Sequence, residues 1–112
     1  MNREVRSTPR FSSLKNGLKV LKMFVDAPLL AYSGAELMKV TGLSSGTLYP
    51  ILFRFEEYGL LQSKWEKGKA QALGRPRRRL YSVTAPGLSV ARYALSELGV
   101  PGLLRLALAR SR

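Results

Sequence analysis

Basic side chains are the residues of this sequence whose number and spacing point to a particular chemistry. The 112-residue chain has 19 lysine and arginine residues against 7 aspartate and glutamate residues, which gives a net charge of +12 at pH 7. Ammonium and guanidinium groups at this density bind polyanions, with nucleic acid as the first candidate and an anionic membrane surface as the second. The densest cluster lies between positions 64 and 79, where Glu66 is the one acidic residue. The basic residues of this cluster are Lys64, Lys67, Lys69, Arg75, Arg77, Arg78 and Arg79.

Side chains suited to catalysis are scarce. The chain has no cysteine and no histidine, which excludes disulfides, thiolate nucleophiles and zinc sites built from these residues. Among the carboxylates only Glu56 and Glu57 are adjacent, and neighbouring positions on a helix point about 100° apart. Such a pair is not arranged for acid–base work or for Mg²⁺. We therefore expect no enzyme activity, no cofactor and no metal site.

The sequence pattern also predicts neither a membrane-spanning segment nor a secretory signal. No apolar run approaches the roughly 20 residues that span a bilayer, and residues 1–6 lack the apolar segment of a secretory signal. We expect a cytoplasmic protein with no membrane partner.

The elements that position the basic residues follow from hydrophobic periodicity. Residues 1–13 carry three arginines without an apolar period, which predicts a flexible basic arm that lies in a minor groove or free in solvent. From Leu14, apolar residues recur at helical spacing opposite a lysine face and stop before Pro28, which predicts an amphipathic helix.

Two short helices joined by a tight turn are predicted next. The segment 33–36 reads Ser-Gly-Ala-Glu, the spacing of a capping box, and Gly42 supplies a helix stop. A second apolar period runs from Leu48 to Phe55. Two starts are open for this second helix. With Thr47 as its cap, Pro50 lies harmlessly in the first turn; with Ser44 or Ser45 as its cap, the first turn is distorted.

A β-hairpin and a last helix complete the pattern. Residues 61–66 and 79–84 alternate with period two, and the Gly-, Pro- and Arg-rich segment between them is predicted to be a long exposed loop. Trp65 alternates in phase with Leu61, so we expect it to pack against the core. Thr84 is predicted to cap a helix that begins with Ala-Pro.

This order of elements is that of a winged helix-turn-helix, a mainly α fold with a small β-hairpin (α+β). We expect a DNA-binding domain at residues 14–84, its wing at about 60–84, and a C-terminal helix and tail at 85–112 for dimerisation. With Gly42 in the turn, the positions to be buried between the two helices are all apolar, namely Leu37, Leu43, Leu48 and Ile51. The expected dimer contacts are Leu88, Ala91, Leu95, Leu98, Leu104 and Leu108.

Outward residues near the start of the second helix are predicted to touch DNA together with the basic cluster. Hydroxyls and helix N-terminal amides suit phosphates, and Arg54 is the long donor able to contact guanine. These residues are Ser44, Ser45, Thr47, Tyr49 and Arg54.

Four stretches of sequence resemble the PadR-like transcriptional regulators over about residues 14–98. They are Gly-Thr-Leu-Tyr-Pro at 46–50, Glu-Glu-Tyr-Gly-Leu-Leu at 56–61, Ser-Lys-Trp-Glu at 63–66, and the segment 74–87 that begins Gly-Arg-Pro-Arg-Arg. The resemblance implies a homodimeric DNA-binding regulator, commonly a repressor, whose last helix mediates dimerisation and whose recognition helix includes Tyr49 and Pro50.

This sequence departs from the family at two informative places. Phe53 stands where the family often has a basic residue, and the C-terminal part has no Trp and only one long helix. The aromatic drug-binding pore of some short members therefore does not carry over, and an effector is left open.

The prediction is a sequence-specific transcriptional regulator, a homodimer that binds a roughly palindromic operator in double-stranded DNA through the helix at about 45–58 and the basic wing. Two other functions are compatible with the residues. One is an RNA-binding or non-regulatory nucleoprotein of the same fold. The other is a membrane- or partner-binding adaptor that uses the apolar tail and the face formed by Lys15, Lys19 and Lys22.

Overall fold

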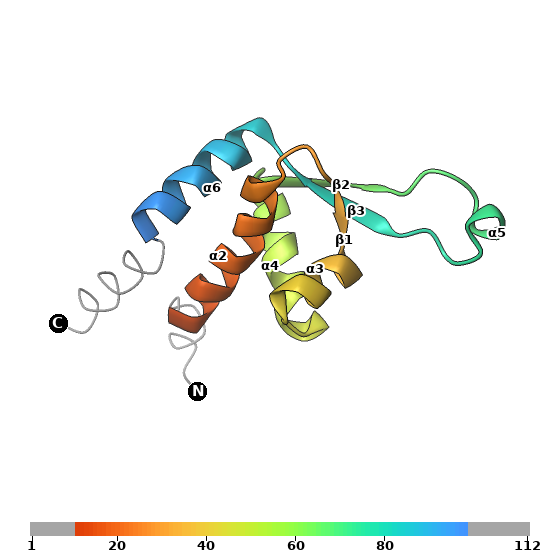
Figure 1. The fold of residues 1–112 in the computed structure, drawn as a ribbon, viewed down its shortest axis with the longest axis horizontal. Coiled ribbons are helices and arrows are strands. Elements are labelled where there is room, and N and C mark those ends of the chain that lie inside the picture. The colour runs from red at the N-terminus through yellow and green to blue at the C-terminus, as the bar shows by residue number, and fades with distance from the viewer. Residues whose placement is uncertain (1–10, 99–112) are drawn as a thin grey trace.

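The computed structural model describes residues 11–98, in which helices cover one face of a small antiparallel sheet whose long hairpin extends away from the body (Figure 1). The helices are α2 (Phe11–Asp26), α3 (Gly34–Thr41), α4 (Ser45–Glu57), α5 (Ala70–Leu73) and α6 (Ala85–Leu98). The strands are β1 (Tyr32–Ser33), β2 (Leu61–Trp65) and β3 (Arg79–Val83), in the order β1-β3-β2. None of the described helices is both long and apolar enough to cross a membrane. The α+β class and the C-terminal helix are as predicted.

Helix α2 places its apolar face on the core and its lysines in solvent. It begins at Phe11, three residues before the predicted start, so residues 11–13 belong to the helix and only 1–10 of the predicted arm lie outside the described residues. Val20 and Phe24 are fully buried, while Lys15, Lys19 and Lys22 are exposed. The amphipathic pattern therefore predicted the correct buried face.

Local hydrogen bonds fix the helix-turn-helix as the sequence predicts. The Ser33 hydroxyl accepts from the Glu36 amide at 3.2 Å, and the Glu36 carboxylate accepts from the Ser33 amide at 2.8 Å, which completes the capping box. Gly42 ends α3 in the left-handed region, with φ of +76°. The Thr41 hydroxyl donates to the Leu37 carbonyl at 2.6 Å and accepts from the Leu43 amide at 3.2 Å. The turn is thus held by its own polar groups.

The structure decides where α4 begins. Ser44 is the N-cap, and Pro50 lies inside the helix. The carbonyl of Ser44 accepts from both the Thr47 amide at 3.1 Å and the Leu48 amide at 2.8 Å, so the first turn is tightened. Pro50 has no amide hydrogen to donate to the Gly46 carbonyl, and this group lies at the exposed end of the helix.

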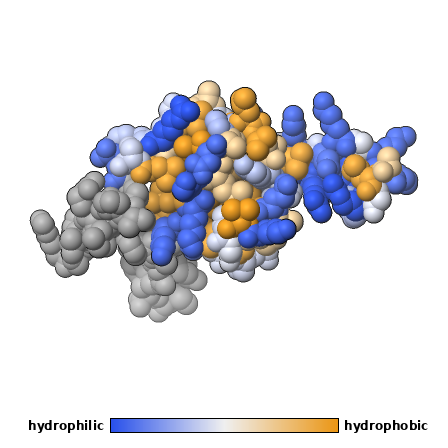
Figure 2. Space-filling model, in the orientation of Figure 1, coloured by the Kyte–Doolittle hydropathy of each residue, from blue (hydrophilic) through white to orange (hydrophobic). Residues whose placement is uncertain are grey.

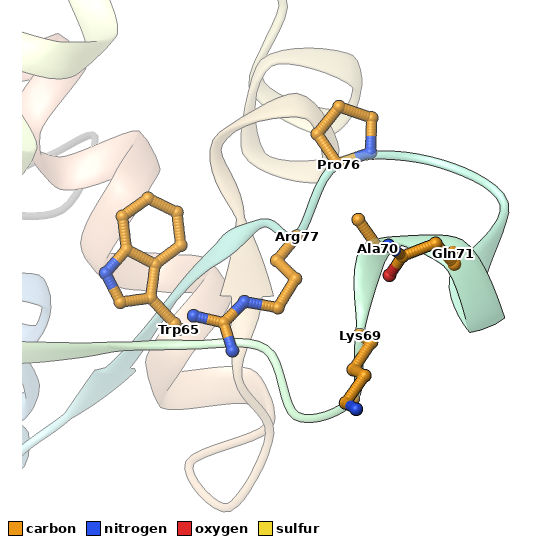
Figure 3. Close-up of a pocket in the computed structure, with 7 residues that line it drawn as sticks. Trp65, Lys69, Ala70, Gln71, Pro76 and Arg77 are labelled. Atoms are coloured by element: carbon orange, nitrogen blue, oxygen red, sulfur yellow. The ribbon is translucent and has the colours of Figure 1, made fainter.

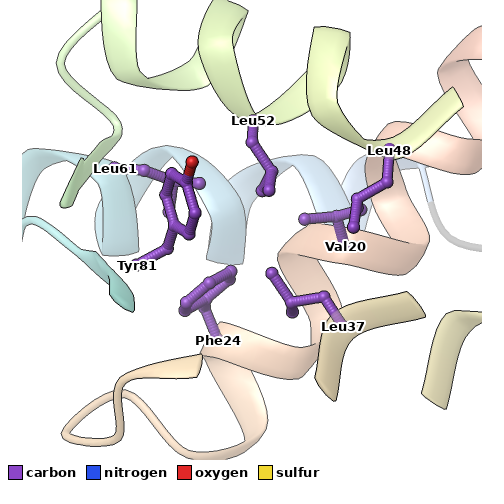
Figure 4. Packing of buried hydrophobic residues seen from close by; sticks show 7 residues of the cluster. All are labelled: Val20, Phe24, Leu37, Leu48, Leu52, Leu61 and Tyr81. Atoms are coloured by element: carbon purple, nitrogen blue, oxygen red, sulfur yellow. The ribbon is translucent and has the colours of Figure 1, made fainter. Parts of the chain in front are cut away.

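The core lies where α2, α3 and α4 meet the sheet (Figure 4). Leu37 and Leu48 are fully buried as the turn predicts, and Leu43 and Ile51 are half-buried against the same cluster. The ring of Phe24 meets that of Tyr32 edge-on at 5.4 Å. The buried cluster consists of Val20, Phe24, Leu37, Leu48, Leu52, Leu61 and Tyr81.

The hairpin differs from the prediction in three details. The tip segment contains the short helix α5, and β3 pairs on its other edge with β1, which period-two alternation could not reveal in two residues. Trp65 was expected to pack on the core, and this is wrong: 53% of its surface is exposed. It does share the core-facing side of the hairpin with Leu61, but the body ends before it reaches Trp65.

Helix α6 is bound to the base of the hairpin and to α2. The Thr84 hydroxyl donates to the Gly59 carbonyl at 2.7 Å and accepts from the Gly87 amide at 2.9 Å, so the predicted cap also joins α6 to the end of the α4–β2 turn. Ala91 is fully buried, and α6 packs along α2.

Candidate nucleic-acid interface

The start of α4 forms an exposed polar surface. Ser44, Ser45 and Thr47 are all exposed, and the Ser44 side chain makes no capping bond to the helix amides. Its hydroxyl instead donates to the Thr47 hydroxyl at 3.2 Å. The three hydroxyls of Ser44, Ser45 and Thr47 therefore lie together at the exposed first turn of α4, and hydroxyls at the start of a helix suit contact with phosphate oxygens.

The rest of the outward face of α4 carries aromatic and basic groups. Arg54 and Phe53 are exposed, whereas Tyr49 is half-buried and packs against the core cluster. The Tyr49 hydroxyl lies so close to Gly34 that a methyl group on that glycine would be 2.1 Å from it. Tyr49 is thus fixed by the start of α3, with one edge open to solvent.

Basic side chains surround the hairpin tip, and the right-hand end of the molecule is hydrophilic over most of its visible surface (Figure 2). Within residues 11–98, neither hydrogen bond nor ion pair holds the side chains of Lys64, Lys67, Lys69 and Arg78. These four cations are available to an external anion.

Arg75, in contrast, is held inside the wing. Its guanidinium donates to both oxygens of Glu66, at 2.7 and 2.9 Å, and Glu66 also accepts from the Arg78 amide at 3.3 Å. We call this group the wing clasp. The Arg75 hydrogen bonds lower the pKa of Glu66 to about 2, and the same contact raises the pKa of Arg75. The clasp closes the loop that carries Lys67 and Lys69.

The wing clasp predicts a pH dependence of the wing. Because the folded pKa of Glu66 is depressed, the clasp stabilises the wing above the ordinary pKa of 4.5 and loses this effect as pH falls towards about 2. Trp65, the sole tryptophan, lies in the wing and reports on it by fluorescence. We expect its emission to hold from pH 7 to about 4 and to change below about 3. In Glu66→Gln the emission should already be altered at pH 7, with helix content by circular dichroism unchanged; identical pH curves for both proteins would contradict the clasp.

A second polar link connects the wing to α4. The Ser63 hydroxyl donates to Glu56 at 2.5 Å, the Arg79 Nε donates to Ser63 at 2.9 Å, and Arg79 reaches Glu56 at 3.9 Å. Burial, followed by the nearby Glu56 carboxylate, raises the pKa of Tyr81 on the same face. Arg79 therefore fixes the wing relative to α4, a role that the sequence pattern alone did not separate from DNA contact.

Trp65 forms one wall of an open hollow between the two arms of the hairpin (Figure 3). The guanidinium carbons of Arg77 and Arg79 lie 6.0 and 5.4 Å from the centre of its ring. Lys69 and Pro76 line the other sides. The exposed ring of Trp65 thus lies against two arginines of the basic cluster.

The residues predicted for dimerisation differ in how far they are buried and in whether the structure describes them. Leu88 and Leu95 are half-buried and Ala91 is buried inside the chain, whereas the large apolar residues exposed on the described part of α6 are Val90 and Tyr93, which were not among the predicted contacts. Leu98 is the last residue of α6, and Leu104 and Leu108 lie outside the described residues. Across the described part of the chain there is no group of three carboxylates that could hold a metal ion.

A helix-turn-helix with a basic β-wing at its side defines a winged-helix DNA-binding protein. The model of the transcriptional regulator PadR-like family matches residues 21–92, more than half of the chain. The chain belongs to this family and is a DNA-binding transcriptional regulator of winged-helix fold. No curated protein matches it at a significant level.

Three solved structures are similar to this chain over most of their length. A PadR family transcriptional regulator from Eggerthella lenta has 26% identity and a TM-score of 0.59, with 86% of this chain and 90% of that chain covered. A protein from Streptococcus mutans has 22% identity and a TM-score of 0.67, with 93% and 94% covered. A PadR-like regulator from Bacillus cereus has 22% identity and a TM-score of 0.60, with 88% and 96% covered.

Proposed function

We propose that this regulator is a repressor that binds a roughly palindromic operator as a homodimer. Helix α4 enters the major groove, and Lys64, Lys67, Lys69 and Arg78, which make no hydrogen bond or ion pair within residues 11–98, bind phosphates beside it. The observation that carries the proposal is the basic hairpin, which projects beyond the body while its base is bonded to α4 through Glu56 (Figure 1). A rigid link of this kind fixes the distance between groove and phosphate contacts.

The dimer is proposed to form along α6. Val90 and Tyr93 are exposed on the face of this helix that points away from the half-buried Leu88 and Leu95, which leaves a pair of apolar side chains in solvent at the end of the molecule opposite the wing (Figure 1). Two copies joined there would present two α4 helices to half-sites about 34 Å apart. Repression follows if the bound dimer occludes the promoter. We also propose that the regulator acts in the cytoplasm and that it has no catalytic activity, cofactor or metal site.

Selection of bound sequences from random duplex DNA tests this function. We expect an enriched motif with two inverted half-sites separated by one helical turn, and a mass of two chains per site in analytical ultracentrifugation. Structured RNA should compete poorly. A motif without symmetry together with a monomer at micromolar concentration would overturn the homodimer, and the absence of any enriched motif would overturn sequence-specific binding.

Gly46 offers a prediction that separates folding from binding. It is exposed in the first turn of α4, it is not among the glycines with positive φ, and a methyl group there would meet nothing within 4 Å. The folded chain therefore gives no reason for glycine. Gly46→Ala should stabilise the helix by up to about 1 kcal/mol. It should nevertheless weaken operator binding, because the added methyl lies where the helix backbone approaches DNA. Thermal melting and titration of one preparation measure both effects, and unchanged affinity would exclude close approach at Gly46.

A further inference from the structure

The outward face of α4 contains an aromatic ring in place of a hydrogen-bonding side chain. Gly46, Pro50 and Phe53 follow one another at helical spacing on this face, opposite the buried Leu48 and Leu52. All three are exposed, and Phe53 has 58% of its surface in solvent. Because glycine and proline project little, the ring of Phe53 is the largest group along this line.

The Phe53 ring is held by its neighbour. Its centre lies 5.9 Å from that of the Tyr49 ring, with 36° between the planes. Tyr49 is itself fixed between the core cluster and Gly34. An aromatic side chain with a rigid neighbour loses little conformational entropy when it binds, which favours a recognition role over that of an ordinary exposed apolar residue.

The side chains on this face of α4 indicate which group of the DNA it would contact. Phenylalanine has no donor for phosphate, and the next residue along the line, Glu57, is acidic and exposed, so it repels phosphate. In the major groove the one apolar group on a natural base edge is the C5-methyl of thymine. Gly46 and Phe53 are about 10 Å apart along the helix, a length of about three base pairs.

We propose that Phe53 is a specificity-determining residue that contacts the methyl group of a thymine in each half-site. This inference rests on the proposed function, in which α4 lies in the major groove. Arg54, exposed next to it, supplies the hydrogen-bonding contact that Phe53 lacks. Each half-site should therefore contain a required thymine whose methyl, and not only its hydrogen-bonding edge, is recognised.

The first arm of the test changes the DNA and leaves the protein intact. In the selected operator each thymine is replaced in turn by deoxyuridine, which removes the methyl and keeps the base-pairing edge. We expect one symmetric pair of positions to weaken binding by about fourfold per methyl and roughly fifteenfold for both half-sites. All other replacements should have little effect.

The second arm changes the protein. Phe53→Ala should bind the thymine and deoxyuridine operators equally, both about as weakly as wild-type protein binds the deoxyuridine operator. Tyr58→Ala is the matched control, because Tyr58 is an exposed aromatic residue at the end of the same helix. It should keep the thymine preference of the wild type. Since Phe53 and Tyr58 are both exposed, both variants should fold, which melting curves will check.

The outcomes distinguish this inference from the function on which it rests. If wild-type protein binds its operator specifically and no deoxyuridine replacement weakens binding, the thymine contact is overturned and the regulator proposal stands. If a sensitive thymine exists and Phe53→Ala still prefers its methyl, another residue makes the contact and the assignment to Phe53 is overturned. If no sequence is preferred at all, the proposed function itself fails.

Discussion

Replacing Lys67, Lys69 and Arg78 by glutamine is expected to weaken operator binding on the order of 100-fold at physiological salt. These side chains make no hydrogen bond or ion pair within residues 11–98 and lie on the projecting wing. Each phosphate contact that is lost should flatten the slope of log affinity against log salt by about 0.9. Fluorescence anisotropy between about 50 and 200 mM salt measures both quantities. The loss should be similar for specific and non-specific DNA, because phosphates carry no sequence.

A matched variant controls for net charge. Lys15, Lys19 and Lys22 are exposed on α2, and their replacement by glutamine removes the same three charges from another face. This variant should retain most of the affinity and nearly the full salt slope. If the two triple variants flatten the slope equally, the wing has no special role and binding depends on overall charge.

Hydrogen bonds between near neighbours explain which parts of the fold the sequence predicted. The capping box at Ser33 and Glu36, the stop at Gly42 and the cap at Thr84 each involve groups close in sequence or a helix start. Strand β1 was missed because two residues show no period, and its partner in β3 lies far along the chain. The tertiary pairing that makes Tyr32 and Ser33 a strand leaves no local signal.

The sequence predicted where the candidate interface lies, but it could not show which of its basic residues are bound to acidic residues of the same chain. Lysine and arginine density located the wing, yet Arg75 binds Glu66 once the hairpin tip has folded, and Arg79 reaches Glu56 once the hairpin has closed against α4. Trp65 has the predicted phase but lies beyond the end of the body. Alternation shows which face of a strand a residue lies on, but it does not show how far along the strand the helices cover that face, because this depends on tertiary packing.

Gly87→Ala is expected to destabilise the chain more than any other alanine substitution in α6, by about 3 kcal/mol. Gly87 is buried where α6 crosses the base of the hairpin, and an added methyl would lie 2.0 Å from the Leu60 carbonyl oxygen. Backbone atoms cannot rotate away as a side chain does, so the helix itself must shift. Urea unfolding measures the loss.

The control for this variant lies on the same helix. Ser89 is exposed, so Ser89→Ala should change the free energy of unfolding by less than about 0.5 kcal/mol. A similarly small change for Gly87→Ala would show that α6 is not fixed to the hairpin at this contact. A shifted α6 also alters the angle between wing and dimer surface. Folded Gly87→Ala protein should therefore lose affinity for the two-half-site operator more than for a single half-site, since only the former requires correct spacing of two α4 helices.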